Sequence, residues 1–462
     1  MGNSDWQNRS RAALWHPCTQ MKQLDAAPPL PVARGEGAWL FDHDGRRYLD
    51  AVSSWWVNLF GHCNPRINAA LVDQLGKLEH VMLAGATHAP VVELSERLAA
   101  ATSLGHAFYG SDGASATEIA LKMSMHAWRN LGRPDKNGFV SLANGYHGET
   151  VGALAVTDIP LFKATYAPLL RPATQVPTPD ARLAAPGESA EAYALRCADA
   201  LEAYFAAHAD TIAAFIVEPL VQGAAGMAMY HPAYLARARE LCTRYHVHLI
   251  ADEIAVGFGR TGTMFAFEQA AKYLRANDAF PPQAGERDAR RTPHASRPDF
   301  ICLSKGLTGG YLPLSAVLTT DTVFEAFYDD ATARGFLHSH SYTGNPLACR
   351  AALATLDIFE TDRVIDANRV KAAEFSALLA GVAAHPRARH FRHLGMIWAF
   401  DVADAGADFS AGFHRAMLDR GVFLRPIGNT VYLMPPYVTE PDQIGDVAAA
   451  LLACLDGALE AA

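Results

Sequence analysis

Short, mostly apolar runs alternate with helix-forming segments through the middle of the chain. Three such runs are Phe215-Ile-Val-Glu-Pro, His248-Leu-Ile-Ala-Asp and Phe300-Ile-Cys-Leu-Ser-Lys, and a helical pattern from Tyr234 to Tyr245 lies between the first two. Buried strands interleaved with helices are typical of a parallel sheet that is covered on both faces. The alternation therefore predicts an α/β fold with a large domain built on a mostly parallel central sheet.

The two ends of the chain have a different pattern. A helix is predicted over 346–360, followed by strands that end in Val431-Tyr-Leu-Met-Pro-Pro. We expect a smaller α+β domain formed by 336–462 and completed by the N-terminal segment 1–60. Single cores stop growing at roughly 250–300 residues, so a chain of 462 residues is long enough for more than one domain. The remaining residues, 61–335, are expected to form the large domain.

Two stretches interrupt the alternation of strands and helices. Residues 172–189 and 273–298 are rich in proline, alanine and charged residues. Neither stretch has the periodic apolar positions with which a helix or a strand would bury one face. We therefore predict surface loops in both places.

Composition and charge exclude several classes of function. Half of the 462 residues are apolar and 19% are charged, which is typical of an ordinary globular protein. A net charge of −9 without a basic stripe argues against a nucleic-acid partner. No signal peptide or membrane-spanning run is visible. The seven cysteines are odd in number and include no CxxC pair, which argues against a disulfide framework and for a reducing compartment. We therefore expect a cytoplasmic protein with no membrane partner.

Two ionisable residues stand at the carboxyl ends of predicted strands. Asp252 ends one apolar run and Lys305 ends another. Ligands collect at the carboxyl ends of the strands in open parallel sheets, so we expect both side chains to face one crevice. A lysine in such a crevice can form an imine with an aldehyde cofactor, and a carboxylate can keep the pyridine nitrogen of that cofactor protonated. Taken alone, the two residues also fit an ordinary lysine and aspartate.

A helix start upstream is a candidate phosphate site. The helix predicted over 115–128 has Ser115 and Glu118 at the spacing of a capping box. Its first turn offers backbone N–H groups and the positive end of the helix dipole. Gly113 and Ala114 are small enough to let a phosphate approach closely. Many helices start in this way, so the segment alone does not define a site.

Two aromatic segments are candidates for the walls of a binding site. Tyr146 lies between the glycines of Asn144-Gly-Tyr-His-Gly148, on a predicted loop, and could stack on a cofactor ring. Ser54-Trp-Trp-Val-Asn-Leu-Phe60 is densely aromatic and could line an apolar substrate slot. Both segments fit ordinary packing equally well.

A glycine motif between Asp252 and Lys305 raises the alternative of an oxidoreductase. Gly257-Phe-Gly-Arg-Thr-Gly262 matches the G-x-G-x-x-G fingerprint of dinucleotide-binding proteins. In that fingerprint the first glycine directly follows the strand, whereas Asp252-Glu-Ile-Ala-Val intervenes here. We therefore predict a loop that lines the crevice.

Two histidine pairs could permit a metal site. His338-Ser-His340 and His246-Val-His248 each place two imidazoles on one side of an extended segment. No carboxylate or third histidine stands nearby at ligand spacing, so we predict no metal site.

The chain as a whole resembles the class III, fold type I aminotransferases, which depend on pyridoxal 5'-phosphate. The class signature is matched by Ile250–Gly262 and by Ser304–Gly310. Further motifs resemble the branch of this class that acts in biotin biosynthesis. They are His16-Pro17, Ser53–Trp56, His88–Pro90, Gly145–Gly148, Glu218–Gln222, Thr343–Pro346, Arg425-Pro426 and Tyr432–Pro436.

The resemblance implies a role for each candidate residue. Lys305, Asp252 and Tyr146 would be catalytic: the lysine holds the cofactor, the aspartate pairs with its pyridine nitrogen and the tyrosine stacks on its ring. The cofactor-binding residues would be Gly113, Ala114, Tyr146, Glu218, Asp252, Lys305, His340 and Ser341. The substrate-binding residues would be Trp55, Trp56, Tyr146, Lys305, Ser339 and Arg425. Ser341 would reach the cofactor phosphate of a neighbouring subunit, so the resemblance also implies a homodimer.

The reaction that the resemblance implies is transfer of an amino group from S-adenosyl-L-methionine to 8-amino-7-oxononanoate, giving 7,8-diaminononanoate. Lysine is the alternative donor, because His338-Ser-His-Ser-Tyr-Thr resembles the lysine-using branch. Cys18 stands where the family usually has an aromatic residue. Another class III ω-amino-acid transaminase is the alternative activity. A binding module without catalysis is disfavoured, because no candidate catalytic position is lost.

Overall fold

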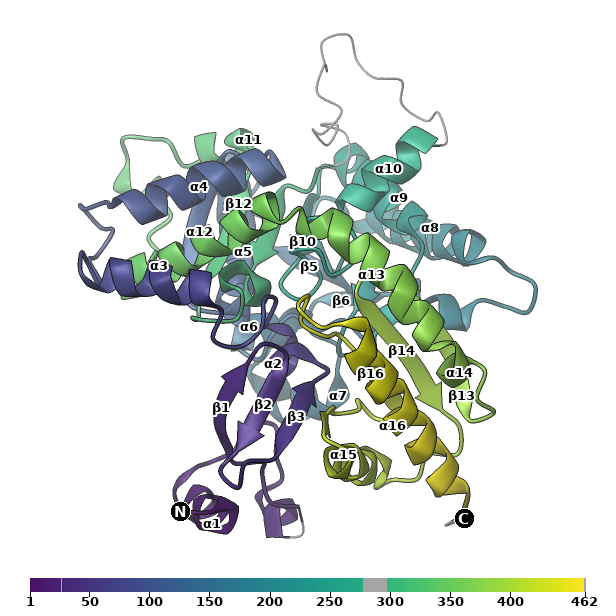
Figure 1. Ribbon diagram of the computed structural model, residues 1–462. Helices are drawn as coiled ribbons and strands as arrows, with labels where there is room; N and C mark the ends of the chain where they lie inside the picture. Colours follow the sequence, from purple (N-terminus) through teal and green to yellow (C-terminus); the bar gives the residue numbers. More distant parts are fainter. Residues whose placement is uncertain (26, 277–296, 461–462) are drawn as a thin grey trace. The chain divides into compact units, whose positions relative to one another are not determined.

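Two compact units make up the chain in this computed structural model, which describes residues 1–25, 27–276 and 297–460 (Figure 1). The smaller unit combines Met1–Asn68 with Asp366–Ala462, and the larger unit is Ala69–Ile365. Most of the loop predicted over 273–298 lies outside the described residues.

The larger unit contains a seven-stranded sheet in the order β4-β12-β11-β10-β7-β5-β6. Five neighbouring strands, from β11 to β6, run parallel, and β12 is antiparallel to both β11 and β4. The mostly parallel sheet predicted from the sequence is therefore confirmed. The strands are β4 (His106–Gly110), β5 (Gly138–Leu142), β6 (Thr174–Val176), β7 (Ile212–Val217), β10 (His248–Asp252), β11 (Phe300–Leu303) and β12 (Ser315–Thr319).

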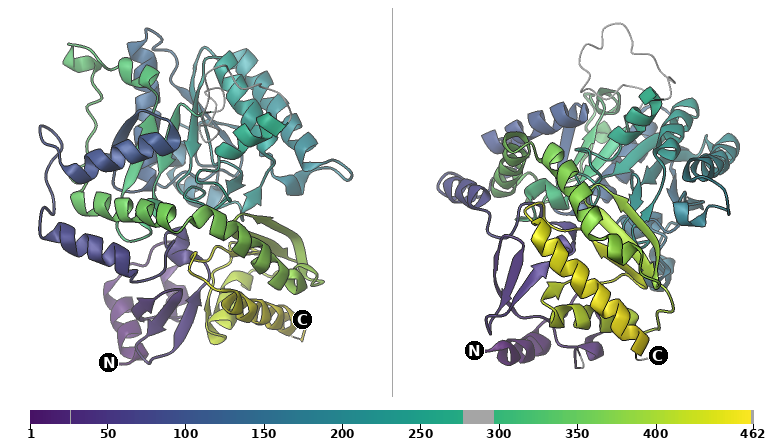
Figure 2. Two further views of the ribbon diagram at one scale, coloured as in Figure 1. Left: turned by 45° about the horizontal axis from the view of Figure 1, so that its top comes forward. Right: turned by 45° about the vertical axis from the view of Figure 1, so that its right-hand side comes forward.

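Helices pack on this sheet and on one another. Helix α5 (Gly113–Asn130) lies against β11 and β12, where Ile119 and Ala120 join a buried cluster with Ile250 and Phe300. Helices α8, α9 and α10 lie together, as do α4 and α12 (Figures 1 and 2). Their bounds are α4 (Ala89–Thr102), α6 (Val151–Val156), α7 (Pro160–Lys163), α8 (Ala190–His208), α9 (Pro232–Arg244), α10 (Glu268–Ala276), α11 (Asp321–Glu325) and α12 (Pro346–Thr361).

Helix α5 begins two residues before the predicted capping box. Its N-cap is Asp112, whose Oδ1 accepts hydrogen bonds from the Ser115 backbone N–H and from the Ser115 hydroxyl, each at 2.8 Å. Glu118 makes no capping box: its carboxylate accepts from the Thr150 hydroxyl and the Gly152 N–H, each at 2.7 Å. The prediction of Ser115 as the cap was therefore wrong, because an aspartate three residues earlier takes that role.

Residues 172–189 are only partly the loop that their composition predicts. Thr174–Val176 forms β6, the edge strand that pairs in parallel with β5, and Ala181–Leu183 forms a short 3-10 helix. An edge strand of three residues is too short to show a periodic pattern. Tertiary pairing with β5 therefore determines its conformation.

The smaller unit has two sheets, in the orders β1-β2-β3-β15 and β13-β14-β16, together with helices. The α+β character predicted for this unit is confirmed. Its strands are β1 (Val32–Glu36), β2 (Trp39–Asp42), β3 (Arg47–Asp50), β13 (Ala388–Leu394), β14 (Ile397–Val402), β15 (Val422–Phe423) and β16 (Thr430–Leu433). Its helices include α1 (Asn3–Ala13), α2 (Ser53–Trp56), α14 (Ala380–Ala383), α15 (Phe409–Asp419) and α16 (Pro441–Glu460).

Two helices cross the bounds of the units. Helix α3 (Pro65–Leu75) spans the end of the N-terminal segment, and α13 (Val364–Leu378) spans the start of the C-terminal one. The sequence pattern predicts the second boundary between residues 335 and 336. Helix α12 belongs to the larger unit, because it packs on α4 and on the turn that begins at Lys305.

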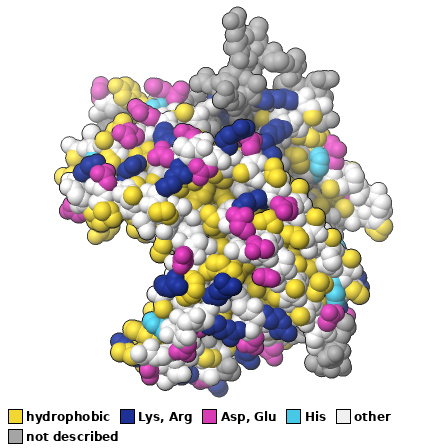
Figure 3. All heavy atoms as spheres, viewed as in Figure 1, with side chains coloured by type: hydrophobic (Ala, Val, Ile, Leu, Met, Phe, Trp, Pro, Cys, Tyr) yellow, Lys and Arg dark blue, Asp and Glu magenta, His cyan; other side chains and the backbone are white. Residues whose placement is uncertain are grey.

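The surface carries both signs of charge. On the face seen in Figure 3, acidic and basic side chains are interspersed over most of the area. In the part of the chain that the structure describes, no helix is both long enough and apolar enough to cross a bilayer.

Candidate active site

Asp252 ends β10 as a buried carboxylate with two partners. Its Oδ2 lies 2.7 Å from His147 Nδ1, and its Oδ1 accepts the Ile254 N–H at 3.1 Å. The side chains of Asp252 and His147 are only 4% and 1% exposed. A charge buried to this degree is costly unless it is paired, so the imidazole holds the aspartate in place as a negative group.

Lys305 follows β11, the strand next to β10, and begins a short 3-10 turn. Its φ of 46° lies in the left-handed region, which costs a non-glycine residue about 1–3 kcal/mol and is typical of functional positions. Burial lowers the pKa of the Lys305 amine, and the negative charges of Asp252 and Glu218 only partly oppose this effect. A lowered pKa leaves more of the amine in its neutral, nucleophilic form.

Glu218 anchors the loop that carries Tyr146. Its carboxylate accepts the N–H groups of Tyr146 at 3.0 Å and of Gly223 at 2.9 Å. Burial raises the pKa of Glu218 to about 7, and nearby Asp252 adds to the rise. The Tyr146 hydroxyl donates to Glu149 at 3.0 Å, and its ring meets the edge of Phe162. The loop is thereby tied to the strand that ends beside β10.

Close packing surrounds the start of α5. A Cβ added to Gly113 would lie 2.9 Å from Ile254 Cγ2, so only glycine fits at this position. Gly148 has a φ of 121°, and a Cβ there would lie 2.6 Å from Ala114 Cβ. The first N–H groups of any α-helix have no partner within the helix and favour an anion. The Ser111 hydroxyl stands beside them, 3.1 Å from His340 Nδ1.

These groups meet the chemical needs of pyridoxal phosphate. An aldehyde needs an amine of lowered pKa, which Lys305 supplies. A pyridine nitrogen needs a buried carboxylate, which Asp252 supplies. A phosphate needs a helix start with small residues, which Gly113 and Ala114 supply. The larger unit therefore contains a donor set that fits this cofactor.

The glycine motif 257–262 forms a turn and not a dinucleotide-binding helix start. Residues 263–267 separate Gly262 from the first residue of α10, Glu268. The buried Glu253 fixes this turn by accepting the N–H groups of Ala266 at 2.9 Å and Phe267 at 2.8 Å. The predicted loop is confirmed, and the alternative of an oxidoreductase loses its structural basis.

Glu253 makes the stability of the protein depend on pH. Burial raises its pKa from 4.5 to about 8, so the folded protein holds this proton more tightly than the unfolded chain does. The corresponding stability is complete below pH 4.5 and is lost as the pH rises through 8. We expect Glu253→Gln to flatten the fall in Tm between pH 6 and pH 9, by the equivalent of roughly 1–3 kcal/mol.

Thermal unfolding of both proteins across this pH range tests the prediction. Glu360→Gln is the matched control, because its carboxylate is 73% exposed in the ion pair with Arg97. The control should keep the slope of the wild type. Equal slopes for Glu253→Gln and the wild type would contradict the prediction.

The predicted substrate residues Trp55, Trp56 and Arg425 belong to the smaller unit. Arg425 Cζ lies 6.0 Å from the centre of the Trp55 ring, which is 50% exposed, and its Nη2 donates to the Cys18 carbonyl at 3.3 Å. Trp56 is buried, and its Nε1 donates to the Tyr432 hydroxyl at 3.0 Å. The structure thus brings Arg425 and Trp55 together and turns Trp56 into the core of this unit.

A strained turn presents the two tryptophans. Ser53, Ser54, Trp55 and Trp56 all have positive φ, between 46° and 74°. Asp50 holds the turn by accepting the Ser54 N–H at 2.9 Å and the Ser54 hydroxyl at 2.7 Å. Four consecutive left-handed residues are costly, and such strain persists where the surrounding structure enforces it.

Ser339 and Ser341 are exposed on the segment before α12. His340 lies between them and contacts Ser111. Among the described residues, no three His, Cys, Asp or Glu side chains converge as a metal site would require. His248 contacts the Ser124 hydroxyl at 2.9 Å and stacks on Trp128.

Sequence reasoning missed two residues of this arrangement. It preferred Tyr146 in the 144–148 segment and gave His147 no role, although His147 is the direct partner of Asp252. It also gave Glu253 no role. A histidine flanked by glycines on a loop was the one available signal for His147, because nothing in the sequence reports a distance to residue 252.

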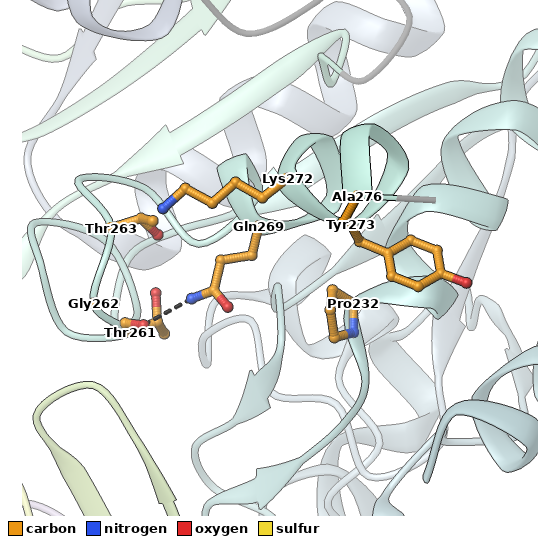
Figure 4. A pocket seen from close by; sticks show the side chains of 8 residues that line it. All are labelled: Pro232, Thr261, Gly262, Thr263, Gln269, Lys272, Tyr273 and Ala276. Carbon is orange, nitrogen blue, oxygen red and sulfur yellow. Dashed lines mark hydrogen bonds between the residues drawn. The ribbon is translucent and has the colours of Figure 1, made fainter. Parts of the chain in front are cut away.

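A separate hollow of about 410 Å³ lies beside α10 (Figure 4). It is lined by Pro232, the 261–263 turn and one face of α10. Gln269 donates across it to the Thr261 carbonyl at 2.7 Å. None of the predicted site residues lines this hollow. The arrangement around Lys305 is therefore a different site.

Comparisons with known proteins give the family of the chain. The family described as aminotransferase class III matches residues 21–274 and 290–455, and the chain belongs to this family of pyridoxal-phosphate-dependent aminotransferases. It is 42% identical over 453 residues to the adenosylmethionine-8-amino-7-oxononanoate aminotransferase of Helicobacter pylori, with 96% of each chain covered. The solved structure of the enzyme with the same name from Methanocaldococcus jannaschii superposes with a TM-score of 0.88 at 33% identity and covers 98% of this chain and 99% of that one. An omega transaminase from Pseudomonas jessenii, solved in complex with PMP, superposes with a TM-score of 0.88 at 27% identity. The match covers 98% of this chain and 97% of that one.

Proposed function

We propose that this aminotransferase moves an amino group from S-adenosyl-L-methionine to 8-amino-7-oxononanoate and so forms 7,8-diaminononanoate for biotin biosynthesis. The observation that carries the chemistry is the buried Asp252–His147 pair at the end of the strand next to Lys305. The choice of substrates is supported by the names of relatives at 32–42% identity over at least 91% of this chain.

Each residue has one task in this reaction. When bound, pyridoxal phosphate supplies an electron sink that stabilises negative charge on the carbon bearing the amino group. Lys305 Nζ would move the proton between that carbon and the cofactor. Asp252, fixed by His147 Nδ1, would pair with the pyridine nitrogen. Tyr146 stacks on the ring, and Gly113 with Ala114 binds the phosphate.

Substrate recognition uses the smaller unit and the segment before α12. Arg425 binds the carboxylate of 8-amino-7-oxononanoate, because a guanidinium can donate two parallel hydrogen bonds to a carboxylate. Trp55, which is exposed, walls the apolar chain of this substrate, whereas Trp56 is buried in the core of the smaller unit. Ser339, which is exposed in the larger unit, is the remaining substrate-binding residue of this proposal.

A half-reaction with each donor tests the proposed substrates. S-adenosyl-L-methionine should remove the visible absorbance of the purified enzyme within seconds, and 8-amino-7-oxononanoate should restore it. Lysine at equal concentration should leave the absorbance unchanged. Conversion by lysine and not by S-adenosyl-L-methionine would replace the donor, and conversion by simple ω-amines alone would identify an ω-transaminase, the activity named for the structure from Pseudomonas jessenii.

We also propose a cytoplasmic homodimer in which Ser341 completes the phosphate site of the partner. Ser341→Asp should then be inactive, because a carboxylate repels a phosphate. Co-expression of Ser341→Asp with Lys305→Ala should restore about a quarter of wild-type activity, since half of the dimers are mixed and each has one intact site. The measurement is activity of the co-expressed protein, purified without separating mixed dimers from the others. No recovery would show that Ser341 serves its own subunit, and full activity of Ser341→Asp alone would show that it serves neither.

A further inference from the structure

A chain of hydrogen bonds leads from the middle of α5 to the start of that helix. Lys122 Nζ lies 2.8 Å from His338 Nδ1, and His338 Nε2 lies 3.1 Å from His340 Nε2. His340 Nδ1 lies 3.1 Å from the Ser111 hydroxyl. All four residues belong to the larger unit. No step of the proposed reaction uses Lys122, His338 or Ser111.

Lys122, the first residue in this series of hydrogen bonds, determines which atom donates in each of them. A lysine ammonium only donates, so His338 Nδ1 accepts and His338 carries its hydrogen on Nε2. That hydrogen is donated to His340 Nε2, which leaves the hydrogen of His340 on Nδ1. Burial, helped by Lys122 and His340 and opposed by Glu118, lowers the pKa of His338. His338 is therefore neutral at pH 7 and able to accept.

The Ser111 hydroxyl is the last group in this series of hydrogen bonds. Because His340 Nδ1 donates to this oxygen, the single hydroxyl hydrogen of Ser111 has to find a different acceptor. Ser111 precedes the N-cap Asp112, whose Oδ1 is already occupied by Ser115. Among the described residues the Ser111 hydroxyl has no hydrogen-bond partner besides His340, so its hydrogen remains available at the end of α5 that favours anions.

We propose that Lys122, His338 and His340 act as positioning residues that hold the Ser111 hydroxyl as a hydrogen-bond donor to the cofactor phosphate. The proposal rests on the proposed function, because it takes the phosphate to bind at the start of α5. It also explains the histidine pair: both ring nitrogens of each histidine are engaged within the chain of hydrogen bonds, which leaves neither residue a nitrogen for a metal ion.

The test compares two ligands that differ only in the phosphate. Full-length protein freed of cofactor is titrated with pyridoxal phosphate and with pyridoxal, and Kd is read from absorbance. Ser111→Ala should raise the Kd for pyridoxal phosphate about 10- to 100-fold, as expected for a hydrogen bond to a charged group. Lys122→Met, which removes the first donor, should raise it about 3- to 10-fold. The Kd for pyridoxal should stay unchanged in both variants.

A double-mutant cycle shows whether Lys122 acts through Ser111, here called the relay, or whether the two residues act independently. In the Ser111→Ala background, Lys122→Met should cause no further loss. Lys77→Met, on an exposed lysine paired with Asp73, is the matched control and should bind as the wild type does. Should Lys122→Met fail to fold, Lys122→Ala removes the same donor.

Three results would overturn the relay while leaving the proposed function intact: wild-type affinity in Ser111→Ala, additive losses in the double variant, or equal losses for pyridoxal and pyridoxal phosphate. A wild-type protein that binds neither ligand would overturn the proposed function, and the relay with it.

Discussion

Lys305→Ala is expected to abolish turnover and to remove the visible absorbance of the purified enzyme. Burial lowers the pKa of this amine, and in the proposed reaction it both holds the aldehyde and moves the proton. A positioned general base alone contributes about 10²–10⁴-fold, so the total loss should reach at least the upper end of this range. The measurements are kcat with saturating substrates and the absorbance spectrum of equal amounts of protein.

Two further variants make this prediction specific. Lys305→Arg keeps the positive charge but cannot form the imine, so it should be as inactive as the alanine variant. Lys77→Ala, which removes an exposed lysine, should keep both activity and absorbance. Retained turnover in Lys305→Ala, or loss of absorbance in Lys77→Ala, would contradict the assignment.

Asp252→Asn should produce the second largest effect. Asparagine keeps the size of the side chain and can still accept from Ile254 with its one oxygen, but it places an NH2 group where Oδ2 faces His147 and removes the buried negative charge. The pyridine nitrogen then loses the partner that keeps it protonated, and each unit of its pKa is worth about 1.4 kcal/mol. We expect kcat to fall about 10²- to 10³-fold while the cofactor remains bound.

The ratio of activity to bound cofactor measures this effect. Cofactor content is read from absorbance, and kcat is expressed per bound cofactor. Asp210→Asn, in an exposed ion pair with Arg133, is the isosteric control and should match the wild type. A loss of activity in Asp252→Asn that merely follows a loss of cofactor would contradict an electronic role for this carboxylate.

The part of the site that lies on strands could be predicted from the sequence. Asp252 and Lys305 each end an apolar run, and parallel strands bring such ends together, so the closeness of these two residues followed from topology alone. The helix that starts at Gly113 was predicted from a capping-box spacing, which placed its cap at Ser115 and not at Asp112.

The part that depends on contacts between loops could not be predicted. His147 reaches Asp252 across 105 residues of sequence, and Ser111 reaches His340 across 229. Such pairs are created by tertiary packing, which leaves no local periodicity or spacing to read. The edge strand β6 was missed for a related reason, since its conformation comes from its partner β5.

Reduction of the purified enzyme with borohydride, followed by peptide mass mapping, tests the central claim most directly. Borohydride fixes an imine as a stable secondary amine, so the modified lysine can be identified. The pyridoxyl group is expected on the peptide that contains Lys305 and on no other. A group on a different lysine, or no modified peptide after saturation with pyridoxal phosphate, would contradict the account.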